Sequence, residues 1–221
     1  MYRIRPLNAV GTDSSAVTRA SIIKAAAPLF AQQGYEATRT REIADKAKAN
    51  VSAINYHFGS KMGLYQAVIK EQAEQQIANY PLTTDDVKSR DPETRFRHLV
   101  NNLLRRVLSQ SANPVQGRIC VREFAEPTEA LDFLVKEIVS QQFAISRDVV
   151  ADMVGRPVDE DELHRIQVSV TSQCFYYGMA NPMLTRLGVK IPETEEEIAV
   201  LADHIIRFSL AGITACKTEA A

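Results

Sequence analysis

The chain has 221 residues, of which 45% are hydrophobic and 24% charged, values typical of a soluble globular protein with a sizeable core. No uninterrupted apolar run approaches the roughly 18 residues that cross a bilayer, and residues 1–15 lack the apolar stretch of a signal peptide. Its three cysteines (Cys120, Cys174 and Cys216) are far apart and without metal-ligand spacing. We therefore expect a cytoplasmic protein with no disulfide framework, metal site or membrane association.

The charged residues are unevenly distributed. Residues 1–61 hold nine Lys or Arg and four Asp or Glu, a net charge of +5, whereas residues 62–221 hold 17 basic and 23 acidic residues, a net charge of −6. A basic end on an acidic body is what a phosphate-binding module joined to a second domain needs. Charge alone does not distinguish this arrangement from chance.

Amphipathic helical periodicity dominates from residue 15 to residue 215, and no segment alternates with the period of a strand. The first predicted helix begins at Ser15 and ends at Gly34, with a local kink expected at Pro28. A polar stretch after Tyr80-Pro81 marks the clearest boundary. The sequence predicts an all-α protein of about nine helices, over residues 15–34, 40–48, 50–58, 60–80, 96–108, 119–125, 128–154, 159–180 and 194–215.

Two of these segments have the spacing of a helix-turn-helix. The helices over 40–48 and 50–58 are joined by a three-residue turn, Lys48-Ala49-Asn50. Ala44 and Ala47 are small where the two helix axes must approach closely. We therefore divide the chain into a flexible basic arm (1–14), a helix-turn-helix domain (15–65) and a helical body (66–221), with the helix that continues to about residue 80 linking the last two.

The second helix of the pair has a surface suited to the major groove of DNA. Asn55 can bond an adenine bidentately, Val51 or Ala53 can contact a thymine methyl, and Ser52 can donate or accept. Phosphate contacts are expected from the start of the preceding helix and from Lys61, whose charge beside a helix N-terminus is unfavourable without an anion. The predicted DNA-binding residues are Thr38, Thr40, Arg41, Lys48, Val51, Ser52, Ala53, Asn55, Tyr56, His57 and Lys61.

Residues 18–65 resemble the DNA-binding domain of the TetR family of regulators. One subgroup of the family has a similar wording, N-V-x-A-I-N-Y-H-F-G-S-K, in which Asn55 replaces the commoner Tyr. The glycine of the family's turn is Lys48 here, and either backbone strain of about 1 kcal/mol or a nearby phosphate would account for it. About fifteen positions match in register within the segments Leu29-Phe30, Gly34-Tyr35, Thr38, Ile43-Ala44, Ala47, Ile54-Asn55-Tyr56-His57-Phe58, Ser60-Lys61 and Leu64-Tyr65.

The resemblance implies a homodimer whose last two long helices form a four-helix interface, and a ligand pocket among the central helices. The apolar faces of residues 159–180 and 194–215 are consistent with that interface, or with intramolecular core. Polar and aromatic residues within apolar segments are the ligand-binding candidates, although each is equally consistent with a core, surface or interface contact. They are His98, Arg122, Glu123, Glu126, Gln173, Tyr176 and Tyr177. Cys174 fits an oxidant sensor or a buried thiol.

The resemblance further implies a ligand-responsive transcriptional regulator, a repressor that binds a palindromic operator as a dimer and is released by a small-molecule effector. Its expected partners are double-stranded DNA, a second copy and the effector; no cofactor and no catalytic residue are predicted. An activator of the same fold or an interaction module without DNA binding are the alternatives. An enzyme is disfavoured because the four histidines lie in separate segments and no phosphate loop or nucleophile elbow is present. Arg3 and Arg5 fit a minor-groove arm or a disordered tail.

Overall fold

The computed structural model describes residues 11–112 and 114–218. These residues form helices and contain no strand, so the predicted all-α class is confirmed. The elements in chain order are α1 (Gly11–Ala37), α2 (Thr40–Ala47), α3 (Val51–Phe58), α4 (Lys61–Asn79), α5 (Asp85–Lys88), α6 (Pro92–Ala112), α7 (Pro114–Ala125), α8 (Glu129–Leu134), the π-helical turn η1 (Val135–Val139), α9 (Ser140–Val154), α10 (Glu160–Met179), α11 (Asn181–Arg186) and α12 (Glu195–Thr218). Arg3 and Arg5 lie outside the described residues.

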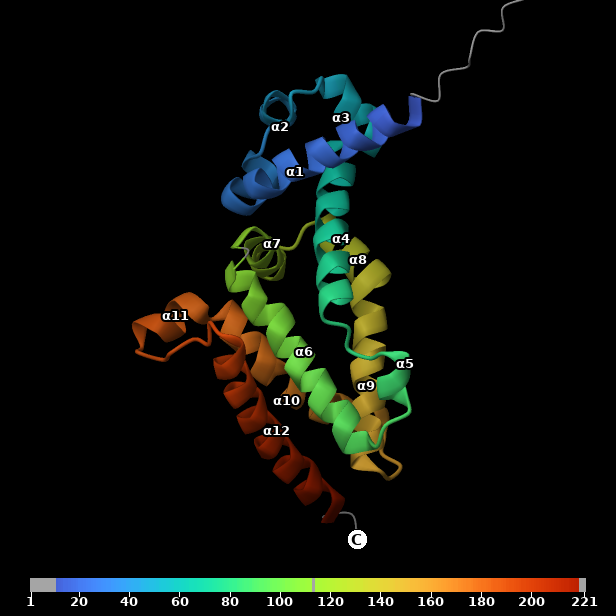
Figure 1. Cartoon of the computed structure of the whole chain (residues 1–221), viewed down its shortest axis with the longest axis vertical. Coiled ribbons are helices and arrows are strands. Elements are labelled where there is room, and N and C mark those ends of the chain that lie inside the picture. The colour runs from blue at the N-terminus through green and yellow to red at the C-terminus, as the bar shows by residue number, and fades with distance from the viewer. Residues whose placement is uncertain (1–10, 113, 219–221) are drawn as a thin grey trace, which may run out of the picture.

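The molecule is elongated, with α1, α2 and α3 at one end and α4 leading from them into the other helices (Figure 1). We call residues 15–65 the head and residues 66–218 the body. Two hydrophobic cores fill these parts. One lies among α6, α9, α10 and α12, around Phe96, Leu104 and Ile205. The other is the core of the head around Phe30 and Ile54.

The head core does not end at residue 65. Ile119 of α7, and Ala130, Leu134 and Ile138 of α8 and η1, belong to the same buried cluster as the head residues. The helix formed by α8, η1 and α9 therefore starts against the head core and ends in the body core, where Val150 is buried. Its π-helical turn, in which the Ser140 Oγ donates to the Val135 carbonyl at 2.6 Å, lies at the head-core end of this helix, since Ile138 belongs to that core.

Two prolines outside the predicted helices lie at the starts of helices. Residues 109–118 belong to no predicted helix, yet α7 begins at Pro114, and Asn181-Pro182, directly after the predicted helix over 159–180, begins α11. The physical reason is the same at both sites: the first turn of a helix has no partner for its N–H groups, so a missing donor costs nothing there. The short helices α5 and α11 are the elements the prediction lacked.

Within α1 the break from helical geometry lies at Gly34, with φ 82° and ψ 174°, whereas Pro28 keeps helical dihedral angles. The predicted kink at Pro28 is therefore wrong in position. Glycine is favoured at residue 34 by this positive φ, and a Cβ there would lie 2.7 Å from Nη1 of Arg122 in α7, which would have to move aside.

The helix α12 is long and apolar enough to cross a membrane by length and composition, with a mean hydropathy of 1.5 over Glu195–Cys216. The sequence did not indicate α12 as a possible membrane-spanning helix, because charged and polar residues interrupt its apolar residues. Its buried side, including Ile205 and Ile206, packs into the body core.

Candidate nucleic-acid interface

The two predicted helices of the helix-turn-helix are formed by α2 and α3. Ile43 and Ala44 of α2 and Ile54 of α3 are buried, at 0%, 2% and 0% exposure, so the helices meet across small and branched apolar side chains. Asn50 caps α3, since its Oδ1 accepts a hydrogen bond from the Ser52 backbone N–H at 3.0 Å. The cap and the buried contacts with α2 therefore fix where α3 begins and which side of it faces the head core.

Lys48 ends α2 in the left-handed conformation, with φ 53° and ψ 38°. Among the described residues it is the only non-glycine residue with positive φ. Its backbone N–H donates to the Asp45 carbonyl at 3.2 Å, and the Ala49 N–H donates to the Ala44 carbonyl at 2.9 Å. The Lys48 side chain is exposed, so lysine adopts the geometry that favours glycine while its ammonium group faces solvent.

The outward face of α3 is polar. Ser52, Asn55 and Tyr56 are exposed, and Tyr56 at 81% is the most exposed of the large apolar side chains described. Val51 and Ala53 are half-buried and pack against the head core. Ser52 therefore lies about one helical turn from Asn55 and Tyr56, on the same exposed side of α3. This is the geometry of a helix that reads base edges.

The Thr38 side chain is not available for the predicted contact with DNA. Its side chain is 1% exposed, and its hydroxyl donates to the Gly34 carbonyl at 2.7 Å. The side chain thus satisfies the carbonyl at the break in α1 and is closed to a phosphate. The other predicted phosphate contacts, Thr40 and Arg41, are half-buried and exposed respectively at the first turn of α2.

Lys61, at the first position of α4, has partners within the head. Its Nζ donates to the Glu36 carbonyl at 3.0 Å and lies 4.4 Å from the centre of the Tyr35 ring. These contacts offset the unfavourable position beside a helix N-terminus, so the charge does not by itself require an anion. His57, the last predicted contact of α3, is half-buried with its ring edge-on to Tyr56 at 5.0 Å.

The predicted ligand-binding residues do not gather around one cavity. His98 bonds the Pro81 carbonyl at 2.9 Å, Glu126 is exposed, and Tyr177 packs against the body core. Arg122 and Glu123 lie at the contact between α7 and the head. Cys174 is fully buried, and burial raises the pKa of its thiol to about 12, which favours the buried-thiol interpretation over an oxidant sensor.

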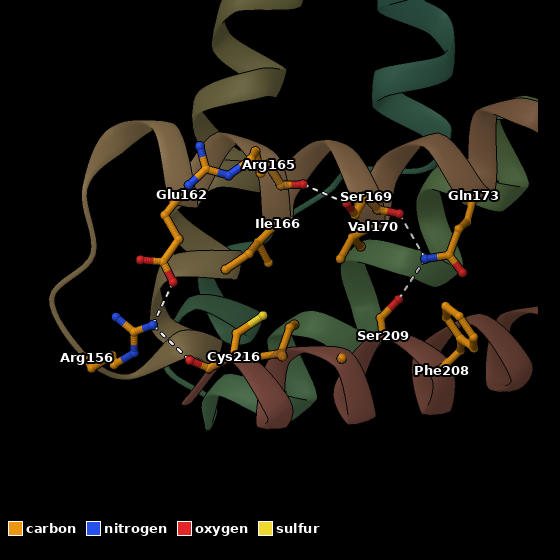
Figure 2. A pocket seen from close by; sticks show the side chains of 12 residues that line it. Arg156, Glu162, Arg165, Ile166, Ser169, Val170, Gln173, Phe208, Ser209 and Cys216 are labelled. Atoms are coloured by element: carbon orange, nitrogen blue, oxygen red, sulfur yellow. Dashed lines mark hydrogen bonds and ion pairs between the residues drawn. The ribbon is translucent and has the colours of Figure 1, made fainter. Parts of the chain in front are cut away.

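A cavity of about 570 Å³ lies between α10 and α12, and Figure 2 shows its lining. Gln173, one of the predicted ligand-binding residues, donates from Nε2 to the Ser209 Oγ across it at 3.1 Å. Arg156 closes one end through Glu162 at 2.6 Å and the Cys216 carbonyl at 2.9 Å. Phe208 borders the other end and is 67% exposed.

Large apolar side chains are exposed along the same two helices. They include Tyr176, the remaining ligand-binding candidate, and an exposed side of α12 that runs from Val200 to Phe208. Several exposed large apolar side chains on neighbouring helices are typical of a protein contact. The exposed set on α10 and α12 is Val168, Phe175, Tyr176, Met179, Val200 and Phe208.

The sequence has matches in two family models. Residues 22–68 match the model described as bacterial regulatory proteins, tetR family, and residues 92–213 match the C-terminal domain of the HTH-type transcriptional dual regulator CecR. The second model alone covers more than half of the chain. The chain belongs to the TetR family of transcriptional regulators.

Individual TetR-family relatives match over part of their length. The chain is 31% identical over 87 residues to the probable HTH-type transcriptional regulator YttP of Bacillus subtilis, covering 39% of this chain and 42% of that protein. It is 37% identical over 84 residues to the HTH-type transcriptional repressor NicS of Pseudomonas putida, 38% of each. The chain is 28% identical over 142 residues to the HTH-type transcriptional dual regulator CecR of Shigella flexneri, and the match covers 61% of this chain and 63% of that protein. The chain thus spans less than two thirds of these curated relatives.

Solved structures share the TetR-family fold. FadR of Bacillus subtilis in complex with stearoyl-CoA superposes with a TM-score of 0.66 at 14% identity, over 87% of this chain and 98% of that one. A putative TetR-family transcriptional regulator of Mesorhizobium loti superposes with a TM-score of 0.64 at 20% identity, over 89% of this chain and 96% of that one. The arrangement of head and body is therefore that of the family.

Sequence reasoning missed the junction between head and body. The Tyr65 hydroxyl donates to the Glu123 carboxylate at 2.7 Å, although 58 positions separate the two residues. The burial of Tyr65 beside this carboxylate raises the pKa of its phenol far above the ordinary value. Tyr65 is part of the family motif, and a buried tyrosine needs a hydrogen-bond partner, but the pattern alone could not name it.

Proposed function

We propose that this TetR-family chain is a ligand-responsive repressor that binds a palindromic operator as a homodimer and is released by a small-molecule effector. The observation that carries the DNA-binding part is the outward face of α3. Ser52, Asn55 and Tyr56 project from a short helix whose opposite side is anchored by the fully buried Ile54. A rigid helix with a polar outer face and the basic charge of residues 1–61 fits a major groove.

Within this proposal the contacts divide by chemistry. Asn55 and Ser52 read base edges, and Tyr56 lies beside the backbone or a base. Arg41, Lys48 and Lys61 meet phosphates, together with the Thr40 region at the start of α2, where helix N–H groups favour anions. Val51, Ala53 and His57 contribute at the edges of the contact, because they are half-buried. Thr38 acts by shaping the backbone and is left out of the contact set.

The dimer contact of the proposal lies on α10 and α12. The cavity between these helices is bordered by Phe208 and floored by small residues such as Gly212, so helices of a second copy would fit against it. Covering the exposed Val200, Phe208 and Phe175 would remove a large apolar area from water, which is the main driving force of association. The two heads would then face successive major grooves, about one helical turn of DNA apart.

The effector part of the proposal is a population shift. A ligand that binds one separation of the two heads better than another would move the dimer away from the DNA-bound form. Repression is proposed because the matched NicS is a repressor. The C-terminal match to a dual regulator makes activation by the same fold the second candidate. Since DNA is the proposed partner, the cytoplasm is the proposed compartment.

Selection of duplexes from a random-sequence library by the full-length chain tests the proposal. We expect enrichment of one palindrome, with binding that weakens steeply as salt rises. Asn55→Ala should reduce affinity by about five- to a hundredfold for each half-site of the selected palindrome and relax the preference at one position of each half-site. Asn79→Ala is the matched control, because Asn79 is also an exposed helical asparagine but lies at the far end of α4.

Two results would count against this function. Equal binding of random and selected duplexes by the wild-type chain would favour an interaction module without sequence-specific DNA binding. Equal loss of affinity in Asn55→Ala and Asn79→Ala would remove α3 as the reading helix. Transcription from a promoter that carries the selected palindrome, with and without the chain, decides between repression and activation.

A further inference from the structure

The junction between head and body contains a buried carboxylate. Glu123 of α7 is 1% exposed, and its Oε1 accepts from the Tyr65 hydroxyl at 2.7 Å. Its Oε2 accepts from the Thr128 backbone N–H at 3.1 Å and from the Thr128 hydroxyl at 3.0 Å. Burying a carboxylate is costly unless several donors satisfy it, and here the donors come from α4 and from the start of α8. Glu123 therefore ties three elements together.

A continuous series of contacts joins this carboxylate to the proposed DNA surface. The Lys61 Nζ lies 4.4 Å from the Tyr35 ring centre, and the Tyr35 and Tyr65 rings are 5.2 Å apart. The Tyr65 hydroxyl then reaches Glu123. Tyr65 is fully buried and also packs on Phe30 at 4.7 Å, so its ring has no room to reorient without moving the head core.

The residue before Glu123 holds the head at a second point. The Arg122 side chain lies against Gly34, so close that a Cβ at that glycine would be 2.7 Å from Nη1. Gly34 is the break at the end of α1, whose positive φ only glycine adopts readily. Two consecutive residues of α7 thus hold α1 and α4. In Figure 1, α7 lies directly beneath α1 and beside α4.

We propose that Glu123 is a positioning residue for DNA binding: through Tyr65 it fixes the orientation of the head on the body. The inference rests on the proposed function, because in a dimer the orientation of each head determines the separation of the two reading helices. Loss of the Tyr65–Glu123 bond should leave each α3 intact while allowing the two heads to vary in separation. The spacing preference for DNA should therefore fall.

The test compares palindromes of different spacing. The duplex selected by the wild-type chain is compared with duplexes that carry one base pair more or one fewer between the half-sites, by fluorescence anisotropy at fixed salt. In Tyr65→Phe and Glu123→Gln the ratio of affinities for native and altered spacing should fall by roughly two- to thirtyfold, the range for coupling through a packed network. Affinity for a duplex with a single half-site should stay within about twofold of wild type, because α3 is unchanged. The double variant should lose no more than either single variant.

Three variants serve as controls. Thr128→Ser keeps the hydroxyl and should retain the wild-type spacing preference, whereas Thr128→Val removes it and should lower that preference even if Glu123→Gln fails to fold. Ser146→Ala removes a buried hydrogen bond with the Gln167 Nε2, at 2.6 Å, in the body core. It destabilises the chain without touching the junction, and should keep the preference.

The possible outcomes separate the two proposals. If the wild-type chain selects no palindrome, the proposed function fails, and this inference fails with it. If the palindrome is selected but folded Tyr65→Phe and Thr128→Val discriminate spacing as wild type does, the role of Glu123 is overturned while the function stands. An equal loss in Ser146→Ala would assign the effect to general softening of the fold and would likewise overturn it.

Discussion

Replacing Lys48 by glycine should make the protein more stable and weaken its DNA binding. Lys48 has φ 53° and ψ 38°, and the left-handed conformation costs a residue with a Cβ about 1–2 kcal/mol. Glycine adopts it without that cost but gains unfolded-state freedom, which offsets about 0.4–1 kcal/mol. The net gain should therefore be about 0.5–1 kcal/mol, or roughly 1–4 °C in Tm for a chain of this length.

The same substitution removes an exposed ammonium group from the turn beside α3. If that group meets a phosphate, the slope of log affinity against log salt should fall by about one for each phosphate that is no longer neutralised. Lys48→Ala separates the two effects, since it removes the charge and keeps the Cβ. We expect both variants to bind DNA more weakly and only Lys48→Gly to be stabilised.

Urea denaturation at fixed protein concentration and a salt titration of the selected duplex measure both quantities. Destabilisation of Lys48→Gly would contradict the strain argument. An unchanged salt slope in both variants would show that the lysine is tolerated in the turn without a phosphate contact.

Three further results are expected. Phe208→Asp should raise the dimer dissociation constant by roughly thirtyfold or more in sedimentation equilibrium, while Val17→Asp, an equally exposed apolar position on α1, should leave it unchanged. Cys174 should react with iodoacetamide at pH 8 far more slowly than the half-buried Cys216, because burial raises its pKa to about 12, and equal labelling rates in the native protein would contradict its position in the core. The backbone N–H of Glu193 and the ammonium group of Lys190 lower the pKa of Glu197 to about 2. Glu197→Gln should therefore be less stable than wild type at pH 7, and this difference in stability should disappear as the pH falls from about 4.5 to 2. A difference in stability that does not change with pH would refute this.

The periodicity of the sequence predicted the long helices because each presents one apolar face, and local chemistry at their ends was readable where a cap is formed by neighbours. Asn50 and Ser60 are examples, since their side chains bond N–H groups two and three residues later. The start of α7 was predicted too late, and α11 was missed, because proline has two opposite effects on a helix. It ends a helix from inside and favours one from its first turn, and only the surrounding fold decides between them.

The candidate site was predictable to the extent that it is local. The face of α3 follows from eight consecutive residues, so the exposed Ser52, Asn55 and Tyr56 were among the residues named in advance, together with Val51, Ala53 and His57, which are half-buried. The burial of Thr38 could not, because its hydroxyl bonds a carbonyl exposed by the break at Gly34, a consequence of backbone geometry. The Tyr65–Glu123 bond joins α4 and α7, and periodicity shows that a face is apolar without showing which core it enters.

That last point determines how a change in the body could reach the head. Had the chain divided at residue 65, the two parts would meet only through the linking helix α4, and a rotation of the body could be absorbed there. Instead Leu134 and Ile138 lie in the head core while Val150, on the same continuous helix, lies in the body core. A shift of α9 must therefore move the head core, or be taken up within the helix around the π-helical turn Val135–Val139, whose Ile138 belongs to the head core. Because Glu123 and Thr128 fix α4 to the start of this helix, we expect such a shift to rotate the head as a unit.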